Sequence, residues 1–242
     1  MNPTPDTPPE DTAGPVRRVG RRAFLGLVGL GVLGVAVGGR VQSVLSNAAG
    51  SGLGGVLPFG NNWRIYTITG NYPLISRDSY RLQVSGLVDH PTTYSLSDLE
   101  ALPATTLVKT FQCVTGWQVP DVEWKGVRLA DLLTAAGVQP GAVGVSFDSY
   151  DGADTESLTI DQAHLSDVIV AYEMLGKPIT REHGGPVRLY VAPMYGYKSL
   201  KWLSAIRVVD RIEPGYWEQN GYPTNGWLDG TTGNTNPRLG LA

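Results

Sequence analysis

Glycine and proline interrupt this sequence more than any other feature, with 31 glycines and 17 prolines among 242 residues. Proline breaks the interior of a helix and glycine destabilises it, whereas both residues are favoured in turns. This pattern disfavours a helical bundle and favours short strands joined by many turns. We therefore expect a fold rich in β-structure.

The composition is that of an ordinary globular protein, with 42% hydrophobic and 17% charged residues. A chain of this length and balance buries one substantial domain, or at most two small ones. The formal net charge of -3 argues against nucleic acid as the main partner, because nucleic-acid surfaces attract basic proteins.

The N-terminal segment changes character abruptly. Residues 1–16 are rich in proline, threonine and acidic residues, and an arginine pair, Arg21-Arg22, then precedes an uncharged run from Ala23 to Gly39. The pair and its flanks resemble a twin-arginine export signal. We expect residues 1–48 to be this signal or an N-terminal anchor and 49–60 to be a linker. Residues 61–242 then form a domain that is periplasmic or extracellular.

Local patterns predict the elements of that domain. Alternating or β-branched runs predict strands at 80–84, 105–111, 143–149, 168–172, 187–192 and 205–209. A capping-box pattern predicts a helix at 95–102, leucine spacing predicts a second helix between Gly126 and Gly137, and a helical turn is expected at 160–165. We expect a mixed α+β fold with largely antiparallel sheets and short helices.

Cys113 is the single cysteine, so no intramolecular disulfide forms. Paired-cysteine zinc sites, iron–sulfur clusters and covalent haem attachment all need more cysteines or a C-x-x-C-H motif. Three interpretations remain: a buried thiol, a nucleophile with a histidine base, or a soft thiolate ligand of a transition metal.

A second segment offers a group of hydrogen-bond donors. His183, Arg188, Lys198, Ser199 and Lys201 would together suit a phosphate and a polar ring system. Lys198 and Lys201 are three residues apart, so a helical turn would point both the same way.

A crowded acidic stretch has a simpler interpretation. Asp148, Asp151, Asp154 and Glu156 do not follow the spacing of a calcium-binding loop. We expect a solvated acidic turn there.

Taken in order, several motifs resemble the molybdopterin-binding domain of the sulfite oxidase family over roughly residues 60–225. They are Cys113 with Gly116-Trp117, then Trp124 to Leu133, His183-Gly-Gly-Pro-Val-Arg188, and Gly196-Tyr-Lys-Ser-Leu-Lys-Trp202. The resemblance implies a Mo-molybdopterin cofactor whose metal is ligated by Cys113. It also implies cofactor contacts at His183, Arg188, Ser199, Leu200 and Lys201, and at Asn61 or its neighbour Asn62.

The closest branch by resemblance is the catalytic subunit of the periplasmic methionine-sulfoxide reductases. No cation follows Cys113 until Lys125, which disfavours sulfite, and Trp117 and the segment from Gly215 to Tyr222 are similar to that branch. We expect Cys113 and Trp117 to be catalytic, with Trp117 in an aromatic mouth that orients an uncharged or organic substrate. The reaction implied is oxygen-atom transfer that reduces an S- or N-oxide, such as a methionine sulfoxide.

The electrons would come from a separate redox protein, for example a membrane haem protein, since this chain has no haem or cluster motif. We expect the chain itself to be a monomer. Two alternatives stay open from the sequence: an oxidase of a small sulfur compound on the same cofactor, and a secreted binding domain without catalysis.

Overall fold

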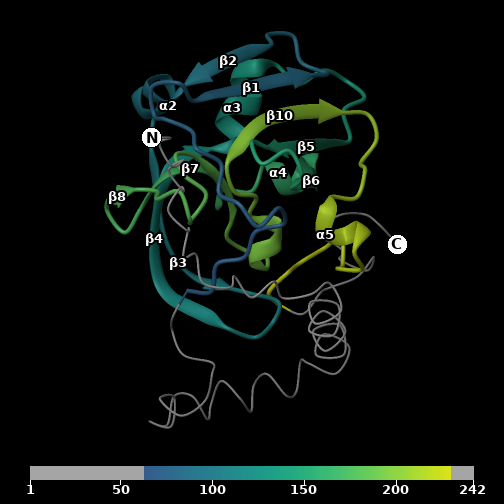
Figure 1. Ribbon diagram of the computed structural model, residues 1–242. Coiled ribbons are helices and arrows are strands. Elements are labelled where there is room, and N and C mark those ends of the chain that lie inside the picture. The colour runs from purple at the N-terminus through teal and green to yellow at the C-terminus, as the bar shows by residue number, and fades with distance from the viewer. Residues whose placement is uncertain (1–62, 230–242) are drawn as a thin grey trace, which may run out of the picture.

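The computed structural model describes residues 63–229 (Figure 1). The expected signal or anchor at 1–48, the linker at 49–60 and the cofactor contact at Asn61 or Asn62 lie outside the described residues. Between residues 63 and 229, no helix is long and apolar enough to cross a membrane.

Two five-stranded sheets form the framework. The first has the order β2-β1-β10-β5-β6, with bounds Thr92–Ser95, Arg81–Gly86, Leu203–Val209, Gly144–Ser149 and Thr155–Thr159. The second has the order β3-β4-β7-β8, with bounds Thr105–Gln112, Gln118–Arg128, Val168–Met174 and Lys177–Pro178, and β9 (Arg188–Val191) also pairs with β7. In the described chain only β1 and β10 pair in parallel, so the expected mixed, largely antiparallel fold is confirmed.

Short helices occur where capping residues predict them. α2 (Leu96–Ala101) has a capping box between Ser95 and Asp98, as expected. α3 (Leu129–Ala136) buries its four predicted apolar residues and ends at Gly137, whose φ of 70° is accessible to glycine without strain. The turn expected at 160–165 is α4 (Ile160–Ala163), and a 3₁₀ turn η2 (Gly196–Lys198) and a short α5 (Tyr216–Gln219) complete the set.

Strand β4 is not among the strands predicted from the sequence, and it contains Pro120. The strand pairs with β7 only from Trp124 to Arg128, so its first part has β3 as its neighbour. The register slips beside Pro120 and Asp121, and Asp121 has a positive φ of 52°. A bulge on a singly paired stretch tolerates proline, because its missing N–H leaves no central ladder bond unmade.

The prediction of a solvated acidic turn is wrong for two of its four residues. Asp154 is 8% exposed and Glu156, on β6, is 2% exposed. Burial of a carboxyl group requires partners, and Glu156 has one in Lys198, which lies far away in the sequence.

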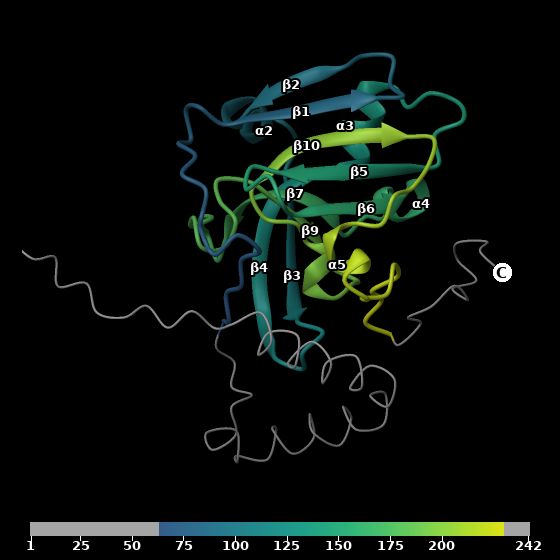
Figure 2. The ribbon, with the colours of Figure 1, turned by 45° about the vertical axis from the view of Figure 1, so that its right-hand side comes forward.

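The core divides into a large and a small cluster. The large cluster lies under the first sheet and includes Leu82, Leu133 and Ile206. The small one packs aromatic residues on the second sheet, among them Phe111, Trp117 and Trp124, with Cys113 at its margin. Figure 2 shows β3 and β4 running away from the first sheet, so the turn that joins them lies far from that sheet.

Candidate active site

Cys113 follows the last residue of β3, as predicted, in a tight turn. Its N–H donates to Trp117 O at 2.9 Å, and Gly116 N donates to its carbonyl at 3.0 Å. Gly116 closes the turn with a φ of 95°, a conformation that side-chain-bearing residues rarely adopt. The backbone thus fixes the direction of the thiol without using the sulfur.

The thiol itself has little to make it reactive. Its Sγ lies 3.2 Å from Thr115 Oγ1. Burial raises the pKa of Cys113, and this outweighs the lowering by Thr115, Arg64 and the Trp117 indole. None of these groups is a histidine, and a reactive thiol has a lowered pKa. The surroundings therefore disfavour a nucleophile and suit a ligand that a bound metal ion would deprotonate.

Aromatic rings form one wall beside Cys113. The Trp63 ring centroid lies 4.9 Å from that of Phe111, 6.0 Å from that of Trp117 and 4.8 Å from that of His183. Trp117 is only 3% exposed, so its side chain is part of the packed wall. We had expected it to line an open aromatic mouth. Its buried Nε1 has no hydrogen-bond acceptor among the described residues.

The structure brings His183, Arg188 and Lys201 together. Burial, and then nearby Arg188, lower the pKa of Lys201 to about 8. Burial, and then Arg188, also lower the pKa of His183. The one carboxyl group coupled to both Arg188 and Lys201 is Asp154, and burial raises the pKa of Asp154 to about 7. Basic groups that lower one another's pKa repel one another in their charged forms, and an anionic ligand such as a phosphate would relieve that repulsion.

Arg188 has a structural role within this cluster. The buried guanidinium donates from Nη1 to His183 O and from Nη2 to Ser199 O, both at 2.7 Å. It thereby ties the loop before β9 to the turn after η2. Gly184 permits this closeness, since a Cβ there would lie 2.7 Å from the Lys201 side chain.

Ser199 and Leu200 use their side chains inside the protein. Ser199 Oγ accepts a hydrogen bond from Val191 N at 3.0 Å, and Leu200 is 1% exposed in the large core cluster. Lys201 Nζ donates to Tyr66 O and lies 4.5 Å from the Trp202 ring centroid. The Ser199 backbone is also engaged, since its N–H donates to Gly196 O and its carbonyl accepts from Arg188.

Lys198 does not join the basic cluster. Its ammonium group is buried against Glu156 and Glu218, whereas that of Lys201 donates to Tyr66 O. The expectation that the two lysines point the same way is therefore wrong. The physical reason is local, because η2 ends at Lys198 and residues 199–201 continue in no helix.

Two neighbours of Cys113 were missed from the sequence. Arg64 lowers the pKa of Cys113, and Cys113 in turn raises that of Tyr222, after burial. Tyr222 falls in the C-terminal aromatic segment that the sequence singled out, although not as a site residue. Nothing in the local sequence marks Arg64, which lies 49 positions before the cysteine that it faces, counting from 64 to 113.

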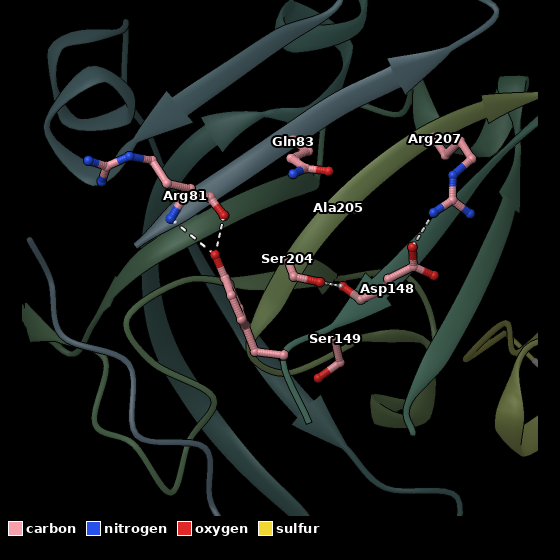
Figure 3. Close-up of a pocket in the computed structure, with 8 residues that line it drawn as sticks. Arg81, Gln83, Asp148, Ser149, Ser204, Ala205 and Arg207 are labelled. Atoms are coloured by element: carbon pink, nitrogen blue, oxygen red, sulfur yellow. Dashed lines mark hydrogen bonds and ion pairs between the residues drawn. The ribbon is translucent and has the colours of Figure 1, made fainter. Parts of the chain in front are cut away.

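A separate hollow of about 390 Å³ lies on the first sheet and contains none of the predicted site residues (Figure 3). It is lined by Arg81, Gln83, Asp148, Ser149, Tyr150, Ser204, Ala205 and Arg207. Arg207 is paired with Asp148 at 2.5 Å, and the Arg81 guanidinium points away from that pair. The charges that border the hollow are thus already compensated or directed elsewhere.

Comparison with known proteins agrees with this geometry. Residues 69–217 match the family described as the oxidoreductase molybdopterin binding domain. The chain is 38% identical over 159 residues to the uncharacterized oxidoreductase YuiH of Bacillus subtilis, which covers 65% of this chain and 80% of that protein. It is 30% identical over 188 residues to sulfite oxidase of Arabidopsis thaliana, covering 63% of this chain and 48% of that protein.

A further relative is the protein-methionine-sulfoxide reductase catalytic subunit MsrP of Ralstonia nicotianae, 31% identical over 153 residues, or 57% of this chain and 46% of that protein. The chain thus spans about half the length of the sulfite oxidase and the reductase. Among solved structures, the sulfane dehydrogenase SoxCD from Paracoccus pantotrophus matches with a TM-score of 0.55 at 24% identity, over 63% of this chain and 46% of that chain. This last match supports the fold.

Proposed function

The chain belongs to the oxidoreductase molybdopterin binding domain family, and from this premise we propose that it is an exported enzyme that reduces an S- or N-oxide. The chain is a molybdopterin-dependent oxidoreductase with Mo-molybdopterin as its cofactor. The substrate, the direction of transfer, the site residues and the electron donor are parts of the proposal.

The residues of the described chain fit this cofactor. Cys113 offers a soft sulfur ligand whose buried thiol has no base of its own. Arg188 and Lys201 offer positive charge, and His183, whose lowered pKa leaves it neutral at neutral pH, offers a ring hydrogen bond, which together suit a phosphate group. When bound, the cofactor would supply a metal that takes the oxygen atom from the substrate and gives up two electrons, which the separate electron donor then replaces.

The observation that carries the substrate proposal is the chemistry of the side chains around Cys113. Thr115, Trp117 and Tyr222 are neutral, and burial raises the pKa of Tyr222 so that its hydroxyl stays protonated at neutral pH. A protonated hydroxyl donates a hydrogen bond to the oxygen of a neutral sulfoxide or N-oxide. Reduction of a sulfoxide consumes two electrons and two protons and releases a sulfide and water.

The electrons come from a separate protein in this proposal. The whole sequence has a single cysteine, and the described residues contain no group of three metal-ligating side chains from histidine, cysteine, aspartate and glutamate. The designation of MsrP as a catalytic subunit supports a division of labour with a second chain. For the same reason we propose that the mature domain, residues 61–242, acts as one monomeric catalytic unit outside the cytoplasmic membrane.

A second candidate is oxidation of a small anionic sulfur compound. Arg64 favours it, because the fold brings this cation to Cys113 although the local sequence shows none. The likeness to a sulfite oxidase also supports it. Against it, Arg64 is exposed and is the only cation that shifts the pKa of Cys113 among the residues described.

Turnover assays separate the two candidates. With reduced viologen as electron donor, methionine sulfoxide, dimethyl sulfoxide and trimethylamine N-oxide should each be tested for dye oxidation. With ferricyanide as acceptor, sulfite should be tested for dye reduction. We expect oxide reduction to dominate, and Arg64→Gln to leave its KM within about twofold. If sulfite oxidation dominates instead, and Arg64→Gln raises the KM for sulfite more than twofold, the second candidate is established.

A further inference from the structure

Lys198, Glu156 and Glu218 form a buried ionic cluster that the proposed chemistry does not use. All three side chains are at most 2% exposed. Lys198 Nζ donates to Glu156 Oε1, to Glu218 Oε1 at 2.6 Å and to Ser157 O at 3.0 Å. Three acceptors satisfy all three ammonium hydrogens, which is what burial of a charge requires.

The cluster contains one carboxyl group more than it has cations. Glu156 Oε2 and Glu218 Oε2 are buried and have no hydrogen-bond partner among the described residues. The two groups interact directly, and burial raises the pKa of Glu156 well above its usual range although Lys198 opposes this. A single proton held between the two free oxygens satisfies both and leaves the cluster neutral, as two carboxyl groups that share a site commonly do.

The three residues come from three segments that otherwise make few contacts. Glu156 lies on β6, Lys198 ends η2 beside the proposed cofactor turn, and Glu218 lies on α5. Two further bonds join the region of η2 to the chain that follows residue 222, from Tyr197 OH to Pro223 O at 2.6 Å and from Tyr195 N to Gly226 O at 2.7 Å.

The segment so attached also carries the neighbour of Cys113. Tyr222 packs on Tyr197, with ring centroids 5.1 Å apart, and on Trp217 at 5.5 Å. α5 has only four residues and no buried residue of its own, so it has little apolar packing to hold it. Among the described side-chain hydrogen bonds of residues 215–222, the one to Lys198 joins this segment to the rest of the domain, whereas those of Gln219 and Asn220 are local.

We propose that Lys198, Glu156 and Glu218 form a latch that positions residues 215–222, and with them Tyr222, beside Cys113, with one proton shared between the two carboxyl groups. The proposal rests on the proposed function in taking Cys113 as the reaction centre. Glu218 is then a positioning residue, and it acts on the substrate through Tyr222.

Hydrogen exchange measured by mass spectrometry on the full-length purified protein tests the latch without any substrate. In Glu218→Ala we expect the peptide that covers residues 215–222 to exchange roughly tenfold faster or more, because a buried charged hydrogen bond is lost. The peptide of α3 should be unchanged. In Glu218→Gln, the exchange rate of residues 215–222 should stay within about twofold of the wild type, because a neutral amide replaces a carboxyl group that shares a proton.

Arg211→Met is the matched control. It removes the cation of another ion pair, with Glu213, close to the same segment, but both side chains are more than half exposed. It should leave exchange of residues 215–222 within about twofold. In turnover assays, Glu218→Ala should raise the KM for the oxide substrate more than it lowers kcat, and Glu218→Gln should restore it.

Each other outcome overturns part of the proposal. Unchanged exchange in Glu218→Ala removes the latch, and equal acceleration by glutamine and alanine removes the shared proton. If Glu218→Ala unfolds, wild-type exchange decides: the amides of Asn220 and Tyr222 must be as protected as those of Lys198 and Ser199. A wild-type protein without turnover would count against the proposed function alone, because exchange still reports on the latch.

Discussion

The guanidinium of Arg188 donates to the carbonyl of Ser199 at 2.7 Å across two segments that the chain separates by a strand and a turn. Its other terminal nitrogen donates to His183 O at the same distance. One side chain thus sets the spacing of the two segments that carry the proposed cofactor contacts. Because the group is buried, its absence would leave two carbonyl oxygens without donors.

Replacement of Arg188 should therefore lower both stability and cofactor content. An ammonium group satisfies at most one of the two carbonyls at this geometry, so Arg188→Lys should cost about 1–3 kcal/mol of the free energy of unfolding and Arg188→Met more. Urea unfolding and molybdenum per chain are the measurements. Arg207→Lys, in an exposed pair, should cost less than about 1 kcal/mol. An Arg188→Met protein with wild-type stability would contradict this role.

Cys113→Ser should abolish activity and the bound molybdenum while the fold persists. The turn at Cys113 is held by backbone bonds that do not use the sulfur, whereas a hydroxyl is a poor ligand for a soft site. Metal analysis with the visible spectrum measures the loss, and circular dichroism checks the fold. Thr115→Ala, which keeps the thiol, should retain molybdenum. Intact turnover in Cys113→Ser would exclude the ligand assignment.

Asp154 should make the protein less stable as the pH rises through neutrality. Burial raises the pKa of Asp154 from 3.8 to about 7, so between these values the folded state keeps a proton that the unfolded state has lost. The stability that this proton contributes is complete below pH 3.8 and is lost as the pH rises through 7. At 1.36 kcal/mol per pH unit, the loss reaches about 4 kcal/mol at most.

Asp154→Asn should remove most of this dependence. Urea unfolding of wild type and variant at pH 5 and pH 8 measures the pH dependence. At pH 8 the variant should be more stable than the wild type. The exposed Asp78→Asn is the control and should leave the difference between the two pH values unchanged. If the stability difference between wild type and variant is the same at both pH values, Asp154 does not change its protonation between them and this prediction is wrong.

Export should depend on the second arginine pair. Lys in place of both Arg21 and Arg22 should leave the protein inside the cell, whereas the same change at Arg17 and Arg18 should not. Fractionation shows where the protein is, and the mass of the exported form shows whether it begins after Ala48 or keeps the segment as an anchor. Unchanged export of the Arg21 and Arg22 variant would count against a twin-arginine route.

Local chemistry explains which parts of the fold the sequence predicted. The box between Ser95 and Asp98, the glycine after α3 and the β-branched run before Cys113 each act within a few residues, and all three are present. β4 escaped prediction because Pro120 is acceptable only where β7 stops short of it. That limit is set by a strand more than forty residues away in the chain, which local patterns do not report.

The same distinction between local sequence patterns and tertiary contacts applies to the candidate site. Cys113 and the gathering of His183, Arg188 and Lys201 followed from motifs, whereas the partners of each side chain did not. Lys198 looked like a free donor because its acceptors, Glu156 and Glu218, lie 42 and 20 residues away in the sequence. The motif marks a position, and only the tertiary fold decides whether the charge there faces a ligand or another residue.

The pairing of β1 with β10 also bears on the order in which the molecule assembles. Tyr80, just before β1, donates to Leu203 at the start of β10, 123 residues later. A ribosome releases the earlier strand long before the later one, so the first sheet stays open until β10 has emerged. Contacts of such long range slow folding and leave unpaired edges exposed to association with other chains. A chaperone that covers these edges until β10 has emerged would lower the risk of such association.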